Sequence, residues 1–229
     1  MKAAPATMRI NRHSVTLRAP LPNESVSNDL RMLSYRLRVF DSILLDLIGE
    51  AAGRSYVDLG AGPLPFALRA QKAGFKVTAA DARPPWTGRS PDGMTVVQAD
   101  VRQFDLSDYD VIGIVGLLYH LRREEQVDLL HRCAARPTII DTEVYCPELV
   151  ASLGIASPRL YPIRLEHGIE GAIMTETGDL WSSHGNDESF WPTEATLIDM
   201  VRDLGWTRMT MVEPPYLSRF GRRRFYVLQ

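Results

Sequence analysis

A short glycine-containing segment between a predicted strand and a predicted helix carries the first residues that could do chemistry. Val57 to Pro65 reads VDLGAGPLP. Glycines at such a turn let ligand atoms approach the backbone, and the first N–H groups of the helix then point at the ligand. A carboxylate at Asp58 would repel a pyrophosphate and attract a cation. The segment, with Gly60 and Gly62, therefore predicts a nucleotide-type site built for positive charge.

Two further aspartates follow the next two predicted strands. Asp81 ends the second strand, where a carboxylate can accept hydrogen bonds from both hydroxyls of a ribose. Asp100 follows the third strand, where its side chain and the amide of Val101 can read an adenine edge. Ligands of open α/β sheets bind at the carboxyl ends of the strands. Together the three aspartates predict an adenosine site at that edge.

The elements that must position these residues alternate between strands and helices. Short apolar runs, typical of buried strands, are separated by segments that can form helices, such as 65–73 and 123–134. An amphipathic helix is predicted ahead of them, over Asn28–Ala52. This alternation predicts an α/β fold with a doubly wound parallel sheet. The predicted strands are Tyr56–Leu59, Phe75–Ala80, Met94–Val97, Val111–Leu117 and Thr138–Ile140.

Two regions depart from this alternation. Residues 1–27 are basic, with no acid before Glu24, and are expected to be an N-terminal tail or active-site flap ahead of a single domain, 28–229. Residues 146–193 are rich in Pro, Gly, Ser and His and are expected to form an irregular lid or acceptor-binding insertion. Regular structure is predicted to return with a helix over Pro192–Leu204 and a strand pair, plausibly antiparallel, over Trp206–Val212 and Arg224–Leu228.

Composition excludes several classes of protein. The chain has 229 residues, of which 45% are hydrophobic, enough for a sizeable core. The net charge of −2 argues against nucleic-acid binding by bulk charge. The longest apolar run, Val111–Leu118, is far shorter than the roughly 20 residues of a membrane-spanning helix, so no membrane span is expected. Cys133 and Cys146 lack metal or redox spacing, which favours a reducing cytoplasm.

These residues resemble the class I S-adenosylmethionine-dependent methyltransferases over roughly Tyr56–Val144 and the C-terminal strand pair. Asp58-x-Gly60-x-Gly62 resembles the first motif of the family, and Gly116–Leu121, GLLYHL, is similar to a stretch frequent in methyltransferases of small molecules, sugars and some transfer RNAs. Pro63, Leu64 and Pro65 depart from the pattern, because a third motif glycine often follows.

The resemblance implies a mostly parallel seven-stranded sheet with an antiparallel C-terminal strand pair, and S-adenosyl-L-methionine as the cofactor. A dinucleotide such as NAD would instead require a third glycine at Pro65, for close packing of helix on strand. The residues expected to bind the cofactor are Asp58, Gly60, Ala61, Gly62, Asp81, Ala82, Asp100, Val101 and Gly116.

Methyl transfer requires a positioned nucleophile that has lost its proton. His120, just past the fourth strand, is expected to be the base or to orient the acceptor; Asp141 and Glu143, after the fifth strand, are expected to bind acceptor hydroxyls. With His120 or His167 they could instead bind a divalent metal such as Mg²⁺. The alternatives are a helix-capping histidine and solvated loop carboxylates. Residues expected to contact the acceptor are Tyr119, Tyr145, His167, Glu170 and Trp181.

The sequence therefore predicts O-methylation of a small or medium-sized hydroxylated acceptor, a sugar or a natural product. A transfer-RNA methyltransferase is the alternative suggested by Gly116–Leu121 and the basic cluster Arg222–Arg224, although the net charge makes nucleic acid an unfavoured partner. A third hypothesis is that the protein is a cofactor-binding subunit that does not catalyse a reaction. The sequence names neither the acceptor nor the methylated atom, and it leaves open metal dependence and a homo-oligomer.

Overall fold

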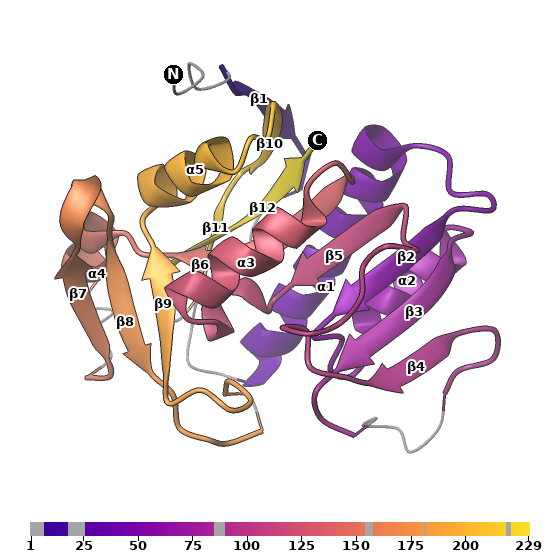
Figure 1. The fold of residues 1–229 in the computed structure, drawn as a ribbon, viewed down its shortest axis with the longest axis horizontal. Coiled ribbons are helices and arrows are strands. Elements are labelled where there is room, and N and C mark those ends of the chain that lie inside the picture. The colour runs from indigo at the N-terminus through magenta and orange to yellow at the C-terminus, as the bar shows by residue number, and fades with distance from the viewer. Residues whose placement is uncertain (1–6, 18–25, 85–89, 154–157, 181, 219–220) are drawn as a thin grey trace.

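A nine-stranded sheet forms the centre of the molecule in the computed structural model, which describes residues 7–17, 26–84, 90–153, 158–180, 182–218 and 221–229 (Figure 1). The strand order is β1-β10-β12-β6-β5-β2-β3-β4, and β11 pairs with β12 outside this path. The strands are β1 (Arg9–Ser14), β2 (Ser55–Leu59), β3 (Lys76–Asp81), β4 (Thr95–Gln98), β5 (Val111–Val115), β6 (Thr138–Val144), β10 (Arg208–Glu213), β11 (Tyr216–Leu217) and β12 (Arg222–Leu228).

The predicted fold class is confirmed. Strands β2 to β6 run parallel to one another, and β12 is antiparallel to both of its neighbours, β6 and β10. The seven expected strands are present, and β1 and β11 add to them. Arg9–Ser14, expected as part of a tail or flap, instead form β1, which pairs in parallel with β10 along its whole length. The basic, poorly apolar sequence of this strand reflects its place at an exposed sheet edge.

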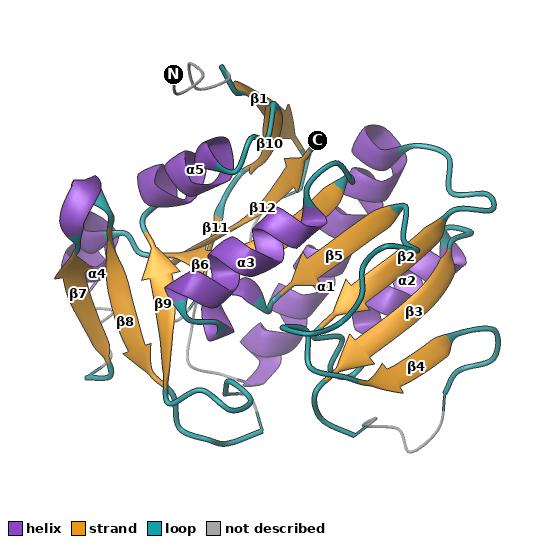
Figure 2. Cartoon of the chain, viewed as in Figure 1, coloured by secondary structure: helices purple, strands orange, loops and turns teal. Residues whose placement is uncertain are grey.

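Helices cover both faces of the sheet (Figure 2). One face packs against α1 (Val26–Ile43), its π-helical extension Leu44–Ile48, and α2 (Pro65–Lys72). The other packs against α3 (Arg123–Cys133) and α5 (Glu194–Asp203). Tyr56 joins the first cluster and its neighbour Val57 the second, because successive side chains of a strand point to opposite faces. The helix predicted over Pro192–Leu204 is α5, and Thr193 caps its N-terminus, its Oγ1 accepting a hydrogen bond from the amide of Thr196.

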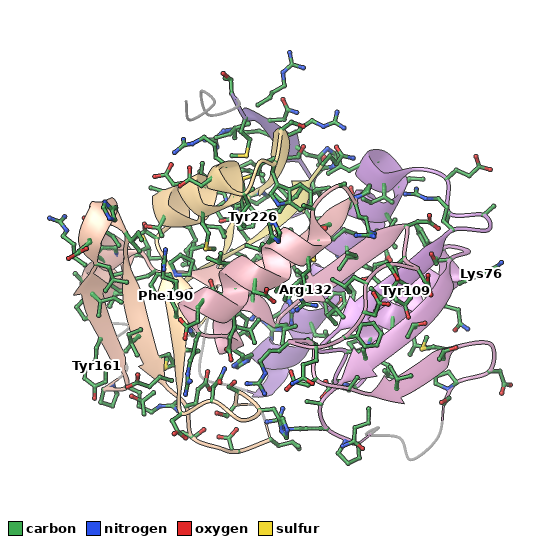
Figure 3. The ribbon with its side chains drawn as sticks, in the orientation of Figure 1. Lys76, Tyr109, Arg132, Tyr161, Phe190 and Tyr226 are labelled. Carbon is green, nitrogen blue, oxygen red and sulfur yellow. The ribbon has the colours of Figure 1, made fainter. Side chains whose placement is uncertain are left out.

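The insertion expected to be irregular contains a second sheet. Helix α4 (Pro147–Leu153) is followed by the antiparallel strands β7 (Leu160–Arg164), β8 (Glu170–Thr175) and β9 (Glu188–Pro192). The periodicity is weak because β7 is an edge strand containing Pro162, with little of its surface buried. Tyr161 of β7, labelled at the outer edge of the molecule in Figure 3, is 55% exposed, whereas Phe190 of β9 is buried.

None of the helices in the described part of the chain combines the length and the apolar character that a membrane span needs.

Candidate active site

The turn between β2 and α2 requires glycine at its first position. Gly60 has φ +68°, and a Cβ there would lie 2.9 Å from Cδ1 of Leu117. Gly62 has φ +48° with open space where a Cβ would be. Leu64, one of the three residues that depart from the family pattern, also adopts a left-handed conformation, with φ +68°, and Pro65 begins α2. The amides of Gly60 and Ala61 both donate to the Ala80 carbonyl, at 2.8 and 3.2 Å, which holds the turn against β3.

The carboxylate of Asp81 faces this turn. Its Oδ2 accepts from the Gly62 amide at 2.9 Å, and its Oδ1 accepts from the Arg83 amide at 2.8 Å. Two backbone donors fix the orientation of the carboxylate and leave it further acceptor capacity, because an ionised carboxylate has about four acceptor sites. The carbonyl oxygen of Ala82, which lies between Asp81 and Arg83 in the sequence, accepts a hydrogen bond from Gln98 Nε2.

Asp100 is paired with an arginine two residues later. The Arg102 amide donates to Oδ1 at 3.0 Å, and the guanidinium lies 2.6 Å from Oδ2. Hydrogen bonds from the Arg102 side chain hold the pKa of Asp100 below its usual range. Val101 is buried beneath them. The Asp100 carboxylate, expected at the adenine edge, is thus ionised, and the guanidinium of Arg102 balances its charge.

Asp58 is buried at the carboxyl end of β2. Burial raises its pKa to about 7, although the Ala67 amide donates to it; nearby Asp81 adds repulsion, and Arg36 lowers the pKa again. A carboxyl group in this environment gains most from a ligand that brings positive charge, because a cation would favour its ionised form. The turn, Asp81 and Asp58 therefore fit an adenosine that carries a cationic group.

Gly116, after β5, lies beside two guanidinium groups, that of the buried Arg223 and that of the partly buried Arg36. A Cβ at this position would be 3.0 Å from Nη2 of Arg223 and 3.1 Å from Nη2 of Arg36. Both arginines bind Asp141, which is fully buried: Arg36 Nε donates at 2.8 Å and Arg223 Nη2 at 2.8 Å. Tyr216 adds a hydrogen bond from its hydroxyl at 2.6 Å. Burial alone would raise the pKa of Asp141, but the two arginines hold it below its usual range.

Asp141 and Glu143 were expected after the fifth predicted strand, and the structure places both within it. Strand β6 continues to Val144 because β12 pairs with its full length, from Leu228 opposite Thr138 to Arg222 opposite Val144. The predicted position after the strand is therefore wrong, and so is the alternative that these two residues are solvated loop carboxylates. Burial raises the pKa of Glu143 to about 7, although Arg223 lies nearby and Ser218 Oγ donates to Oε2 at 2.9 Å.

His120 pairs with an acid that the sequence did not single out, Glu176. Nδ1 of His120 lies 3.2 Å from Glu176 Oε1, and among the described residues Nε2 has no hydrogen-bond partner. Glu176 also accepts hydrogen bonds from Ser182 Oγ, Ser189 Oγ and the Ser183 amide, at 2.7, 2.6 and 3.0 Å. Burial would raise the pKa of Glu176, but its contacts with His120 and the serines lower it to about 2.

The turn that carries His120 is fixed from two sides. The buried Gln126 of α3 donates from Nε2 to the carbonyls of Leu118, Leu121 and Phe190, at 3.0, 3.1 and 2.5 Å. Tyr119, in the same 3₁₀ turn, accepts from Arg223 Nη1 at 3.2 Å. The Tyr119 ring lies 4.3 Å from the His120 ring and 5.6 Å from that of Trp191, centroid to centroid.

The other residues expected to contact the acceptor do not all meet here. Tyr145 and Glu170 line one hollow of about 310 Å³ on the second sheet, with Arg164 and Thr193. His167 is exposed in the turn Glu166–Gly168 between β7 and β8. Trp181 lies outside the described residues.

The expected metal ligands are not gathered into one site. Asp141 is occupied by its arginines, Glu143 by Arg223 and Ser218, and His120 by Glu176, while His167 is exposed. Within the described ranges no group of three or more His, Cys, Asp or Glu residues could hold a metal ion. The Mg²⁺ expectation therefore has no support from the structure.

The basic cluster Arg222–Arg224 is internally paired. Arg224 is buried and lies 2.7 Å from Glu213 and 3.0 Å from Glu194, which is also 3.9 Å from Arg222. Arg223 is the residue that neutralises Asp141. The sequence alone does not reveal these pairs, because the acidic partners come from β6, β10 and α5.

The strand order and the turn after β2 define the fold of class I S-adenosylmethionine-dependent methyltransferases. No protein-family model matches this chain, and no curated protein matches it significantly. Solved structures do match. The N-terminal domain of EvdMO1 with SAH bound aligns at a TM-score of 0.61 and 18% identity, over 89% of this chain and 84% of that chain.

Two further structures have the same fold. Magnesium protoporphyrin IX methyltransferase from Synechocystis PCC 6803, with bound SAH, aligns at a TM-score of 0.59 and 16% identity, over 91% of this chain and 89% of that one. Burkholderia thailandensis 1,6-didemethyltoxoflavin-N1-methyltransferase, with bound 1,6-didemethyltoxoflavin and S-adenosylhomocysteine, aligns at a TM-score of 0.56 and 17% identity, over 88% of this chain and 80% of that one. At these identities the likeness establishes the fold.

Proposed function

We propose that this protein is an S-adenosylmethionine-dependent methyltransferase that methylates a hydroxyl group of a small or medium-sized acceptor, such as a sugar or a natural product. The pairing of His120 with the buried Glu176, beside the strand ends that carry Gly60 and Gly116, is the observation that carries the proposal. The neighbouring structures support the cofactor, since several have SAH or SAM bound; one EvdMO1 structure was determined in the presence of SAH and D-fucose.

Residues of the first half of the sheet would hold the cofactor. Asp81 accepts hydrogen bonds from the ribose hydroxyls, while Asp100 and the Val101 amide bind the adenine edge. Gly60, Ala61, Gly62, Ala82 and Gly116 admit the ligand to the backbone. The buried Asp58 stabilises the cationic end, where its ionised form becomes favourable. The bound cofactor supplies an electrophilic methyl group on a sulfonium.

His120 then acts as the general base. Glu176 is ionised at neutral pH, because its pKa is about 2, and it accepts a hydrogen bond from the Nδ1–H of His120. This tautomer leaves the lone pair of Nε2 free to take the proton of the acceptor hydroxyl. The carboxylate also stabilises the imidazolium that results. Positioned general-base catalysis of this kind contributes about 10²- to 10⁴-fold.

The insertion would form the acceptor side of the site. We propose that Tyr119, next to His120, contacts the acceptor, and that Tyr145, Glu170 and His167 provide outer contacts to larger acceptors. Asp141 and Glu143 would act through Arg36, Arg223 and Tyr119 rather than as bases. Residues 28–229, with β1 added to their sheet, would work as one domain. A location in the cytoplasm is proposed because the described thiols of Cys133 and Cys146 are free.

The test combines a binding measurement with an acceptor screen. Calorimetry with SAM and SAH measures cofactor binding, and methyl-labelled SAM identifies the acceptor among sugars, natural products and transfer RNA. With the acceptor found, we expect His120→Gln and Glu176→Gln to lower kcat, His120→Gln by about 10²-fold or more, while both variants still bind SAH. His131→Gln, on the exposed face of α3, is the control.

Three results would contradict the proposal. Absence of SAM and SAH binding would exclude the methyltransferase. Label transferred to a nitrogen, or to RNA alone, would exclude the hydroxylated small acceptor. Unchanged turnover in both His120→Gln and Glu176→Gln would exclude the base.

A further inference from the structure

Each of the two aspartates at the ends of β3 and β4 is followed, two residues later, by an arginine. Asp81 precedes Arg83, and Asp100 precedes Arg102. In both pairs the amide of the arginine donates to Oδ1 of the aspartate, at 2.8 and 3.0 Å. The backbone of each arginine therefore helps to orient the carboxylate. The Arg102 side chain also pairs with Asp100 through Nε and Nη2, and its Nη1 makes other contacts.

The Arg83 side chain reaches the loop between β8 and β9. We name residues 176–180 and 182–187 the lid loop; it lies on the side of the sheet where the arrows of β3 and β4 end (Figure 1). Nη2 of Arg83 donates to the Ser182 carbonyl at 2.8 Å, with the Asp179 and Ser183 carbonyls at 3.3 and 3.4 Å. A single nitrogen of the Arg83 guanidinium therefore lies within hydrogen-bonding distance of three carbonyl oxygens of the lid loop.

Arg102 reaches the same loop from the neighbouring strand. Its Nη1 donates to Glu125 Oε1 at 3.1 Å and lies 3.4 Å from Asn186 Oδ1. Asn186 Nδ2 donates to Glu125 Oε2 at 2.8 Å and to the His120 carbonyl at 3.3 Å. Gly185, with φ +78°, leaves room for this contact, because a Cβ there would be 3.2 Å from Arg102 Nη2.

The part of the loop held by Arg83 is also the part that holds Glu176. Ser182 Oγ and the Ser183 amide both donate to Glu176 Oε2, and Ser183 Oγ donates to the His120 carbonyl at 2.6 Å. Two short routes therefore join the carboxylates of the adenosine side to His120. One runs through Arg83, Ser182 and Glu176, and the other through Arg102 and Asn186.

We infer that Arg83 and Arg102 are positioning residues that couple occupancy of the adenosine side to the alignment of His120 and Glu176. This inference rests on the proposed function. A ligand that fixes Asp81 and Asp100 also fixes the backbone of the two arginines, so the side-chain contacts to the lid loop cost less conformational entropy. Coupling between two sites is reciprocal in free energy, and typical couplings change affinity by about 5- to 150-fold.

Hydrogen exchange of the lid loop, with SAH as the probe, tests the coupling. In the wild-type protein we expect saturating SAH to slow exchange of lid-loop amides about fivefold or more, the lower end of typical couplings. Arg83→Ala removes the contacts to the loop and keeps the backbone donor to Asp81. We expect it to lose most of this protection even when saturated with SAH, and to lower kcat more than it raises KM for SAM.

Two further variants keep the test decisive. Arg83→Lys, which retains the charge but has one donor group, should give intermediate protection and covers the case in which Arg83→Ala fails to fold. Arg202→Ala, which removes an exposed partner of Asp199 on α5, is the matched control and should behave as wild type. Full SAH-dependent protection in folded Arg83→Ala or Arg83→Lys would overturn the inference. Failure of the wild-type protein to bind SAH would instead refute the proposed function.

Discussion

Replacing Asp58 with Asn should stabilise the protein at high pH while weakening cofactor binding. Asn retains an oxygen that can accept from the Ala67 amide and carries no charge. In the folded protein, burial raises the pKa of Asp58 to about 7 from an ordinary value of 3.8. Between these values the folded state binds more protons than the unfolded chain, so this group makes stability fall as pH rises. The loss is complete above the folded pKa.

The size of the effect follows from the two pKa values. At 1.36 kcal/mol for each pKa unit, the separation between 3.8 and about 7 corresponds to about 4 kcal/mol over the full pH range. Integrating the difference in bound protons puts about 2 to 3 kcal/mol of this between pH 5 and pH 8. The pKa of Glu143 is also raised to about 7, so this residue adds a decrease of stability with pH that is the same in wild type and in Asp58→Asn.

Urea unfolding of wild type and Asp58→Asn at pH 5 and pH 8 measures the difference directly. The advantage of the variant should grow by about 2 to 3 kcal/mol between the two pH values. SAM binding to the wild type should release a proton near pH 6.5, seen as a calorimetric enthalpy that depends on buffer ionisation, and the variant should release none from this site. Parallel stability curves for the two proteins would refute the assignment of a raised pKa to Asp58.

Two further predictions concern the packing of the site. Gly60→Ala places a Cβ 2.9 Å from the Leu117 side chain at a residue with φ +68°, so the free energy of unfolding, measured by urea titration, should fall by about 1 to 3 kcal/mol. Gly53→Ala, at φ +79° with nothing within 4 Å of the added Cβ, should lower the free energy of unfolding by less. Equal losses in the two variants would contradict the steric explanation. Tyr216→Phe removes the hydroxyl 2.6 Å from the buried Asp141 and should cost about 1 to 3 kcal/mol by the same measurement. Tyr35→Phe, whose hydroxyl makes a 3.3 Å bond to a carbonyl, should cost less, and a Tyr216→Phe protein as stable as wild type would refute the role of that hydroxyl.

Local pattern was sufficient to predict much of the fold. The buried parallel strands are short apolar runs, and α5 begins at a threonine whose side chain caps it. The second sheet was missed because β7 is exposed and contains Pro162, so it lacks the alternation that marks a strand. Strand β1 was missed for a similar reason, since a polar edge strand looks like a tail.

The site divides in the same way. Asp58, Gly60 and Asp81 are recognisable because a turn and the strand before it are close in sequence. Glu176 carries no local signal, because its pairing with His120 is made by a fold that brings residues 56 positions apart together. Arg36 carries no local signal for the same reason, because its partner Asp141 is 105 positions away in the sequence.

The position of β12 has a consequence for synthesis of the protein on the ribosome. Strands β2 to β6 emerge before β12, which lies between β6 and β10. The edge of β6 therefore has no partner strand until residues 222–228 have been made. Asp141 meanwhile lacks Arg223, one of its two guanidinium partners. The nascent chain therefore presents an open strand edge, carrying an acid that is buried in the folded protein, until residues 222–228 have been made and have paired with β6.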